Sequence, residues 1–86
     1  MQRGWVISPD YRAAIEAIKS ARIRADISQR ELARRLGKPP SFINKIELLE
    51  RRLDILEFIA VARGLEIEPT ELLEKILSHV SDQFAL

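Results

Sequence analysis

Apolar and polar residues alternate along the chain with a helical period, and this pattern predicts five helical segments. The first is expected over about residues 9–25. Ser8-Pro9-Asp10 supplies an N-cap serine, a proline for the first turn and an acid near the helix start. The apolar positions of this segment are Tyr11, Ala14, Ile15, Ile18, Ala21 and Ala25.

Two short helices are predicted next, over about 28–36 and 40–47. Ser28-Gln29-Arg30-Glu31 is a capping-box pattern, in which the Ser28 hydroxyl and the Glu31 carboxylate each accept from the other residue's amide. Gly37 is expected to end the first of these helices in the left-handed conformation. Lys38-Pro39-Pro40 then forms a stiff turn, and the next helix begins at or near Pro40. The residues expected to point inward are Leu32, Ala33, Leu36, Ile43 and Ile46, with Phe42 beside them.

Two further helices complete the pattern. Asp54-Ile55-Leu56-Glu57 resembles a second capping box, so a helix is expected over about 55–64. Its expected buried positions are Ile55, Leu56, Phe58, Ile59, Ala62 and Leu65. Pro69 opens the fifth helix, whose apolar stripe comprises Leu72, Leu73, Ile76, Leu77, Val80 and Phe84. The sequence therefore predicts an all-α protein with an N-terminal segment (1–8), a five-helix domain (9–77) and a tail or helix extension (78–86).

Composition narrows the class of protein. Eighty-six residues make one domain, and the absence of cysteine excludes a disulfide scaffold or a thiolate zinc site. No apolar run approaches the roughly 20 residues that span a bilayer, so a cytoplasmic protein without a membrane segment is expected. His79 is the only histidine and cannot form a metal site alone. No nucleophile–base pair is visible, so neither an enzyme nor a cofactor is expected.

Charge is distributed unevenly along the chain. Residues 22–52 contain nine basic and four acidic side chains, whereas residues 53–86 contain two basic and seven acidic ones. The net charges of these two regions are therefore +5 and −5. Positive charge concentrated in one region is typical of a surface that faces a polyanion.

The basic region contains a helix-turn-helix pattern, because its two short helices are joined by a tight turn that contains glycine. In such a unit the second helix lies in the DNA major groove, where its N-terminal residues meet base edges. Ser41, Asn44 and Lys45 suit this role, since hydroxyl, amide and ammonium groups can all hydrogen-bond to bases. Ser28 and Gln29, at the start of the first helix, suit a phosphate contact.

The segments SQRELARRLGKPPSFINKIE and ERRLDILEFIAVARGLEIEPTELL resemble the phage-repressor/Cro-type (XRE-like) helix-turn-helix family over about residues 11–77. This resemblance implies a five-helix all-α domain that binds double-stranded operator DNA as a homodimer. It also implies a salt bridge between Arg22 and Glu47 that locks the first helix to the third. The candidate DNA-binding residues are Ser28, Gln29, Lys38, Pro40, Ser41, Asn44, Lys45, Arg51 and Arg52.

The sequence departs from this family at several positions. The family usually has glycine near positions 26, 49 and 66, where this chain has Asp26, Leu49 and Glu66. The family also usually has a serine or threonine cap at position 39, where this chain has Pro39. Pro40, which follows it, offers apolar contact to a thymine methyl group rather than a hydrogen bond.

The leading functional hypothesis is a sequence-specific transcriptional regulator, a repressor that binds a palindromic operator without a cofactor. Val80 and Phe84 extend the last apolar stripe and are the expected dimer contact, because two-fold pairing covers such a stripe on both subunits. Two alternatives remain open. One is an antitoxin that binds both its operator and a toxin, and the other is a protein-interaction module that has lost DNA binding.

Overall fold

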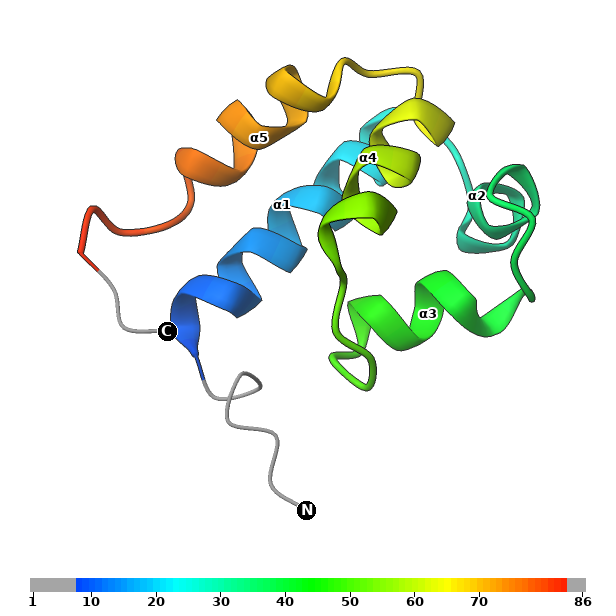
Figure 1. Ribbon diagram of the computed structural model, residues 1–86, viewed down its shortest axis with the longest axis horizontal. Helices are drawn as coiled ribbons and strands as arrows, with labels where there is room; N and C mark the ends of the chain where they lie inside the picture. The colour runs from blue at the N-terminus through cyan, green and yellow to red at the C-terminus, as the bar shows by residue number, and fades with distance from the viewer. Residues whose placement is uncertain (1–7, 84–86) are drawn as a thin grey trace.

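Five α-helices form the described part of the chain, residues 8–83 of a computed structural model (Figure 1). In chain order they are α1 (Pro9–Arg24), α2 (Gln29–Arg35), α3 (Ser41–Glu47), α4 (Ile55–Gly64) and α5 (Pro69–Leu77). Helix α1 packs along α5, and α2 packs on α3. The all-α prediction is confirmed, and the helix boundaries lie within one or two residues of those expected for α1 to α4.

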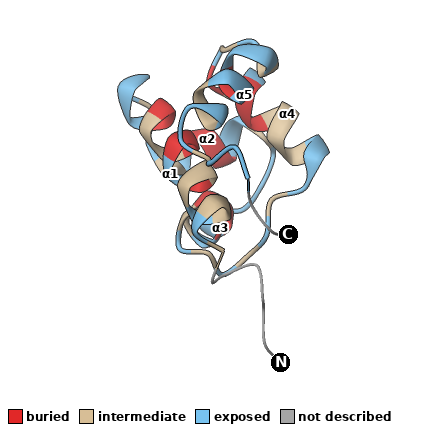
Figure 2. Cartoon of the chain, turned by 90° about the vertical axis from the view of Figure 1, so that its left-hand side faces the viewer, coloured by how far each residue is buried: buried red, intermediate tan, exposed pale blue. Residues whose placement is uncertain are grey.

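The core lies where α1, α2, α3 and α4 meet, and α5 closes it. The largest fully buried side chains are Leu32 of α2, Val61 of α4 and Leu72 of α5. Ile18 of α1 and Ile43 of α3 are buried against them. In Figure 2 the buried parts of the helices, in red, face one another, and the exposed parts, in pale blue, lie on the outside. Burying one such side chain contributes about 1.5–3 kcal/mol, so the apolar face of α3 helps to hold this helix on the domain.

The predicted burial of Ile55 and Leu56 is wrong. These side chains are 76% and 74% exposed, while the buried Val61 was not among the expected positions. The first turn of α4 projects at the edge of the molecule (Figure 2). The apolar stripe of α4 therefore extends into a turn that no other helix covers. Periodicity identifies a face of a helix but does not show where its packing partner ends.

The ends of α1 and α5 also differ from expectation. Ala25 is exposed because it is the C-cap of α1 rather than part of its buried stripe. Helix α5 ends at Leu77, where Ser78 is the C-cap. Leu77 is 59% exposed, and Val80 is half-buried beyond the helix. Phe84 and residues 1–7 lie outside the described residues.

Four of the helices end in the same backbone motif. The residue after each C-cap has a positive φ: Asp26 59°, Gly37 68°, Leu49 63° and Glu66 60°. In each case the next amide donates to a carbonyl five residues back, for example Lys38 to Ala33 at 2.9 Å and Glu50 to Lys45 at 2.8 Å. This is the Schellman arrangement, which satisfies the last carbonyls of a helix. The chain thus keeps the left-handed turn at Asp26, Leu49 and Glu66, the three positions where the family usually has glycine.

Replacing Gly37 with alanine is expected to lower the free energy of unfolding by about 1 kcal/mol. No atom lies within 4 Å of the position that a Cβ would occupy, so the cost comes from the left-handed backbone alone. Asp26→Gly is the matched control. It places glycine, which adopts left-handed angles freely, at an exposed left-handed position of the same motif. Urea titration of both variants measures the difference, and an equally stable Gly37→Ala variant would contradict the explanation.

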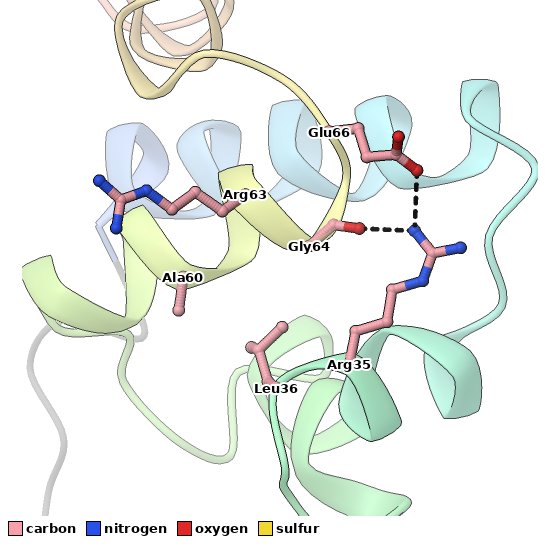
Figure 3. A pocket seen from close by; sticks show the side chains of 6 residues that line it. All are labelled: Arg35, Leu36, Ala60, Arg63, Gly64 and Glu66. Carbon is pink, nitrogen blue, oxygen red and sulfur yellow. Dashed lines mark hydrogen bonds and ion pairs between the residues drawn. The ribbon is translucent and has the colours of Figure 1, made fainter.

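Gly64 has a different role, since it allows α4 to approach α2 closely. A Cβ at this position would lie 2.7 Å from Leu32 Cδ1 and 2.8 Å from Leu36 Cδ1. The Gly64 carbonyl accepts a 2.7 Å hydrogen bond from Arg35 Nη1, which also lies 3.5 Å from Glu66 Oε2 (Figure 3). Arg35 therefore ties the end of α2 to the end of α4 and holds the first helix of the helix-turn-helix unit in place.

Candidate nucleic-acid interface

Helix α3 is locked to the rest of the domain by a charged cluster. Arg22 Nε and Nη2 donate to the two carboxylate oxygens of Glu47 at 2.7 and 3.0 Å. Arg22 Nη1 also donates to the Ile27 carbonyl at 2.9 Å, and Gln29 Nε2 donates to Glu47 Oε1 at 2.7 Å. The side chains of Arg22 and Glu47 are only 10% and 5% exposed. The structure thus brings together the pair implied by the family resemblance and adds Gln29 to it.

The opposite side of α3 carries the side chains that face solvent. Phe42, Ile43 and Ile46 are buried, whereas Ser41 and Lys45 are exposed and Asn44 is half-buried. Within the described part of the chain, Lys45 has no ion-pair partner. A rigid helix therefore presents a hydroxyl, an amide and an ammonium group along one side.

The turn before α3 has the conformation that its prolines favour. Pro40 has helical angles, φ −55° and ψ −28°, although α3 itself begins at Ser41. The Phe42 amide donates to the Pro39 carbonyl at 3.0 Å, and no side chain caps the helix. Pro40 is exposed beside Ser41, so its ring lies next to the polar side of α3.

The predicted capping box at α2 forms only in part. Ser28 Oγ accepts from the Glu31 amide at 3.0 Å, as expected. The Glu31 carboxylate instead accepts from Arg34 Nε and Nη2 at 2.8 and 2.6 Å and from Arg35 Nε at 2.9 Å. Hydrogen bonds from Arg34, and then from Arg35, lower the pKa of Glu31 to about 2. Two neighbouring guanidinium groups therefore outcompete a single backbone amide.

An open groove of about 440 Å³ lies between the start of α2 and the turn before α3. It is lined by Ser28, Arg30, Glu31, Arg34, Lys38 and Pro40. Arg30 and Arg34 were not among the predicted site residues, although their spacing of four places both on one side of α2, and Lys38 follows in the turn after the helix. The groove offers three cations to a phosphate chain, partly offset by Glu31.

The loop between α3 and α4 is held by its two arginines. Arg51 Nη1 and Nη2 donate to the Glu57 carboxylate at 2.7 and 2.5 Å, and its guanidinium lies 4.8 Å from the centre of the Phe42 ring. Arg52 lies over Tyr11, 5.4 Å from the ring centre. The hydroxyl of Tyr11 accepts from the Leu53 amide at 3.1 Å. Arg51 thus has a structural role that sequence reasoning missed, because Glu57 was read only as a capping residue.

Glu57 makes the stability of this loop dependent on pH. Hydrogen bonds from Arg51, the largest cause, hold the pKa of Glu57 below its ordinary value of 4.5. A lowered pKa stabilises the fold above pH 4.5, and this contribution is lost as the pH falls through the folded-state pKa. We expect the wild type to be more stable than Glu57→Gln at pH 7, with the difference narrowing below pH 4.5. Thermal melts from pH 7 to pH 3 test this, and a constant difference would contradict it.

Other kinds of site receive no support from the described residues. Residues 8–83 contain no group of three or more His, Asp or Glu side chains able to hold a metal ion. No helix in this part of the chain is long and apolar enough to cross a membrane. His79 Nδ1 lies 2.8 Å from the Lys75 carbonyl at the end of α5, far along the chain from the helix-turn-helix unit.

Comparison with known proteins agrees with this geometry. The Helix-turn-helix family matches residues 18–72. An XRE-family like protein from Pseudomonas syringae pv. tomato str. DC3000 is 45% identical with a TM-score of 0.74, over 80% of this chain and 84% of that one. The restriction-modification controller protein C.AhdI from Aeromonas hydrophila is 27% identical with a TM-score of 0.63, over 70% and 91% of the two chains.

A third solved structure shares the fold alone. The clp gene regulator ClgR from C. glutamicum is 20% identical with a TM-score of 0.72, over 83% of this chain and 92% of that one. A search of curated protein sequences finds no match. The fold and the polar side of α3 define a helix-turn-helix protein of the DNA-binding class. The chain belongs to the XRE family of DNA-binding transcriptional regulators.

Proposed function

We propose that this protein is a repressor that binds a palindromic operator as a homodimer, with α3 of each subunit in the major groove. The observation that carries this proposal is the exposed polar side of α3 on a helix fixed by the buried Arg22–Glu47 pair. A rigid helix loses little conformational freedom on binding, so its contacts contribute more fully to specificity. No cofactor takes part in this proposal.

The three polar residues of α3 have distinct roles in sequence choice. Lys45 donates to guanine O6 or N7, while Asn44 and Ser41 donate to and accept from neighbouring base edges. Pro40 contributes apolar contact to a thymine methyl group. These contacts set the preferred sequence, whereas contacts to the phosphate chain set the position of the domain and its salt-dependent affinity.

The phosphate contacts come from two places: the groove beside α2 and the loop between α3 and α4. The groove beside α2 places Ser28 and Lys38 next to Arg30 and Arg34. Gln29 joins them, because its amide nitrogen carries two hydrogens and its bond to Glu47 uses one.

In the loop between α3 and α4, Arg52 makes the phosphate contact. Arg51 chiefly holds that loop in position, because its guanidinium group is bound to Glu57 and stacked on Phe42. The loop therefore combines one positioning arginine with one that reaches the DNA backbone.

Selection from a pool of random duplexes tests this function directly. We expect the purified protein to enrich a two-fold symmetric consensus whose half-sites are centred about one helical turn apart. A Lys75→Ala variant, altered on α5 away from α3, should select the same consensus. Failure to enrich any sequence, with equal weak binding to all duplexes, would reject operator recognition and favour the protein-interaction alternative.

A further inference from the structure

A groove of about 430 Å³ lies between α1 and α5, on a different part of the domain from α3. The two helices run antiparallel (Figure 1), because the Ser81 amide that follows α5 donates to Asp10 Oδ1 at the start of α1 at 2.8 Å. Sites for small molecules usually have volumes of about 300–1,000 Å³. The groove is therefore large enough for a small organic ligand.

The floor of this groove is apolar. Ala17 and Ala21 of α1 line it, and they are only 2% and 5% exposed. Ile67, which is half-buried in the segment before α5, lines it as well. Small-molecule sites are lined mainly by apolar side chains, with a few polar groups that orient the ligand. The floor thus suits the apolar body of a ligand.

Two cationic side chains of the groove lack a counter-charge. Arg24 of α1 and Lys75 of α5 line it, and among residues 8–83 neither forms an ion pair. Glu71 lines the same groove one turn before Lys75, yet it pairs with neither cation. These two positive charges and one negative charge sum to +1. The groove therefore favours a ligand with one negative charge, because Glu71 repels a second one.

The last turn of α5 is prepared for an anion beside Lys75. Ser78 Oγ donates to the Lys75 carbonyl at 2.7 Å, and His79 Nδ1 lies 2.8 Å from the same oxygen. Because a carbonyl oxygen only accepts, Nδ1 is the donor in this contact. The Lys75 carbonyl is therefore satisfied by two donors, which removes a free acceptor that would repel an anion beside the Lys75 ammonium group.

We propose that the groove between α1 and α5 binds a small organic acid with one carboxylate and an apolar body. The Lys75 ammonium group binds the carboxylate, and the Ser20 hydroxyl donates to it from the opposite helix. The apolar body lies on Ala17 and Ala21. The groove shares no lining residue with α3 or with the groove beside α2, so this site is separate from the proposed DNA surface.

Octanoate is the probe, and its binding to the full chain is followed in two-dimensional amide NMR spectra. We expect saturable shift changes along the groove, at Ser20, Ala21 and Ser78 among others, and smaller ones in α3. Acetate should bind at least about tenfold more weakly, since each buried methylene increases affinity by about fourfold. Octylamine has the same apolar body with the opposite charge, and it should also bind at least about tenfold more weakly.

Lys75→Met removes the positive charge while keeping a side chain of similar length. We expect its dissociation constant for octanoate to rise by about tenfold, because a charged hydrogen-bond donor is lost. Lys19→Met is the matched control, since it makes the same change at a half-buried lysine of α1 that does not line the groove. This variant should bind octanoate within about twofold of the wild type. Circular dichroism melts check that both variants remain folded.

Three results would overturn the proposal. They are titrations in which octanoate does not saturate, shift changes centred on the groove beside α2, and a Lys75→Met variant that binds octanoate like the wild type. These measurements use no DNA, so they stand apart from the test of operator recognition. A protein that binds octanoate but selects no DNA sequence would retain this site and lose the proposed function. The reverse result would retain operator binding and reject the site.

Discussion

Replacing Glu47 with alanine is expected to lower the free energy of unfolding by about 3–5 kcal/mol, because it leaves a buried guanidinium group without its counter-charge. Arg22 is 9% exposed as a residue and has two of its nitrogens directed at Glu47. Domains of this size have total stabilities near the lower end of about 5–15 kcal/mol. The variant should therefore be partly unfolded at 37 °C, as measured by urea titration and thermal melts.

The double variant Arg22→Met/Glu47→Leu separates two effects: loss of the ion pair itself, and the cost of leaving Arg22 buried without a counter-charge. Removing both charges avoids the isolated buried cation, so the double variant should be more stable than Glu47→Ala. Glu74→Ala, which alters an exposed carboxylate of α5, controls for the removal of one negative charge. A Glu47→Ala protein that melts like the wild type but has lost DNA binding would place Glu47 in recognition rather than in the fold.

Lys45→Ala is expected to weaken binding to the selected operator by about 1–3 kcal/mol, with relaxed choice at one base position. Lys45 is exposed on α3, while the neighbouring Ile46 is buried, so the substitution removes the ammonium group without opening the core. Fluorescence anisotropy with the consensus duplex and with each single-base change at that position measures both effects.

Arg30→Ala tests a phosphate contact, whereas Lys45→Ala tests a base contact. Arg30 lines the groove beside α2, where we propose phosphate contact. Its loss should weaken binding to all duplexes alike and reduce the slope of log affinity against log salt by about one. Unchanged affinity and selectivity in Lys45→Ala would remove Lys45 from the recognition surface.

The sequence predicted the helices well wherever a helix end is determined by local chemistry. Ser8, Asp54 and Pro69 mark helix starts through capping or ring geometry, and Gly37 marks a helix end. These signals act over four or five residues, so they can be read without knowing the rest of the fold.

Features set by distant parts of the chain were not predictable in the same way. The exposure of Ile55 depends on where the neighbouring helices end, and periodicity does not contain that information. The pairing of Arg51 with Glu57 depends on how the loop folds back over Phe42. The Arg22–Glu47 pair spans 25 residues and was anticipated only from the family resemblance.

Leu49 illustrates how tertiary packing overrides a local preference. A left-handed backbone at leucine costs about 1–2 kcal/mol relative to the right-handed conformation. Leu49 nevertheless has φ 63°, completes the turn that ends α3, and packs against the core. The turn after α3 thus has the same backbone geometry as the turns that end α1, α2 and α4, although leucine replaces the usual glycine.

The measurement that tests the central proposal most directly is the affinity of the wild-type protein for its selected palindrome and for a scrambled duplex at several salt concentrations. We expect the palindrome to bind at least about 1,000-fold more tightly than the scrambled duplex. Affinity for both should fall steeply as salt rises, because Lys and Arg contacts release counterions. Equal affinity for the two duplexes across the salt series would contradict sequence recognition by α3.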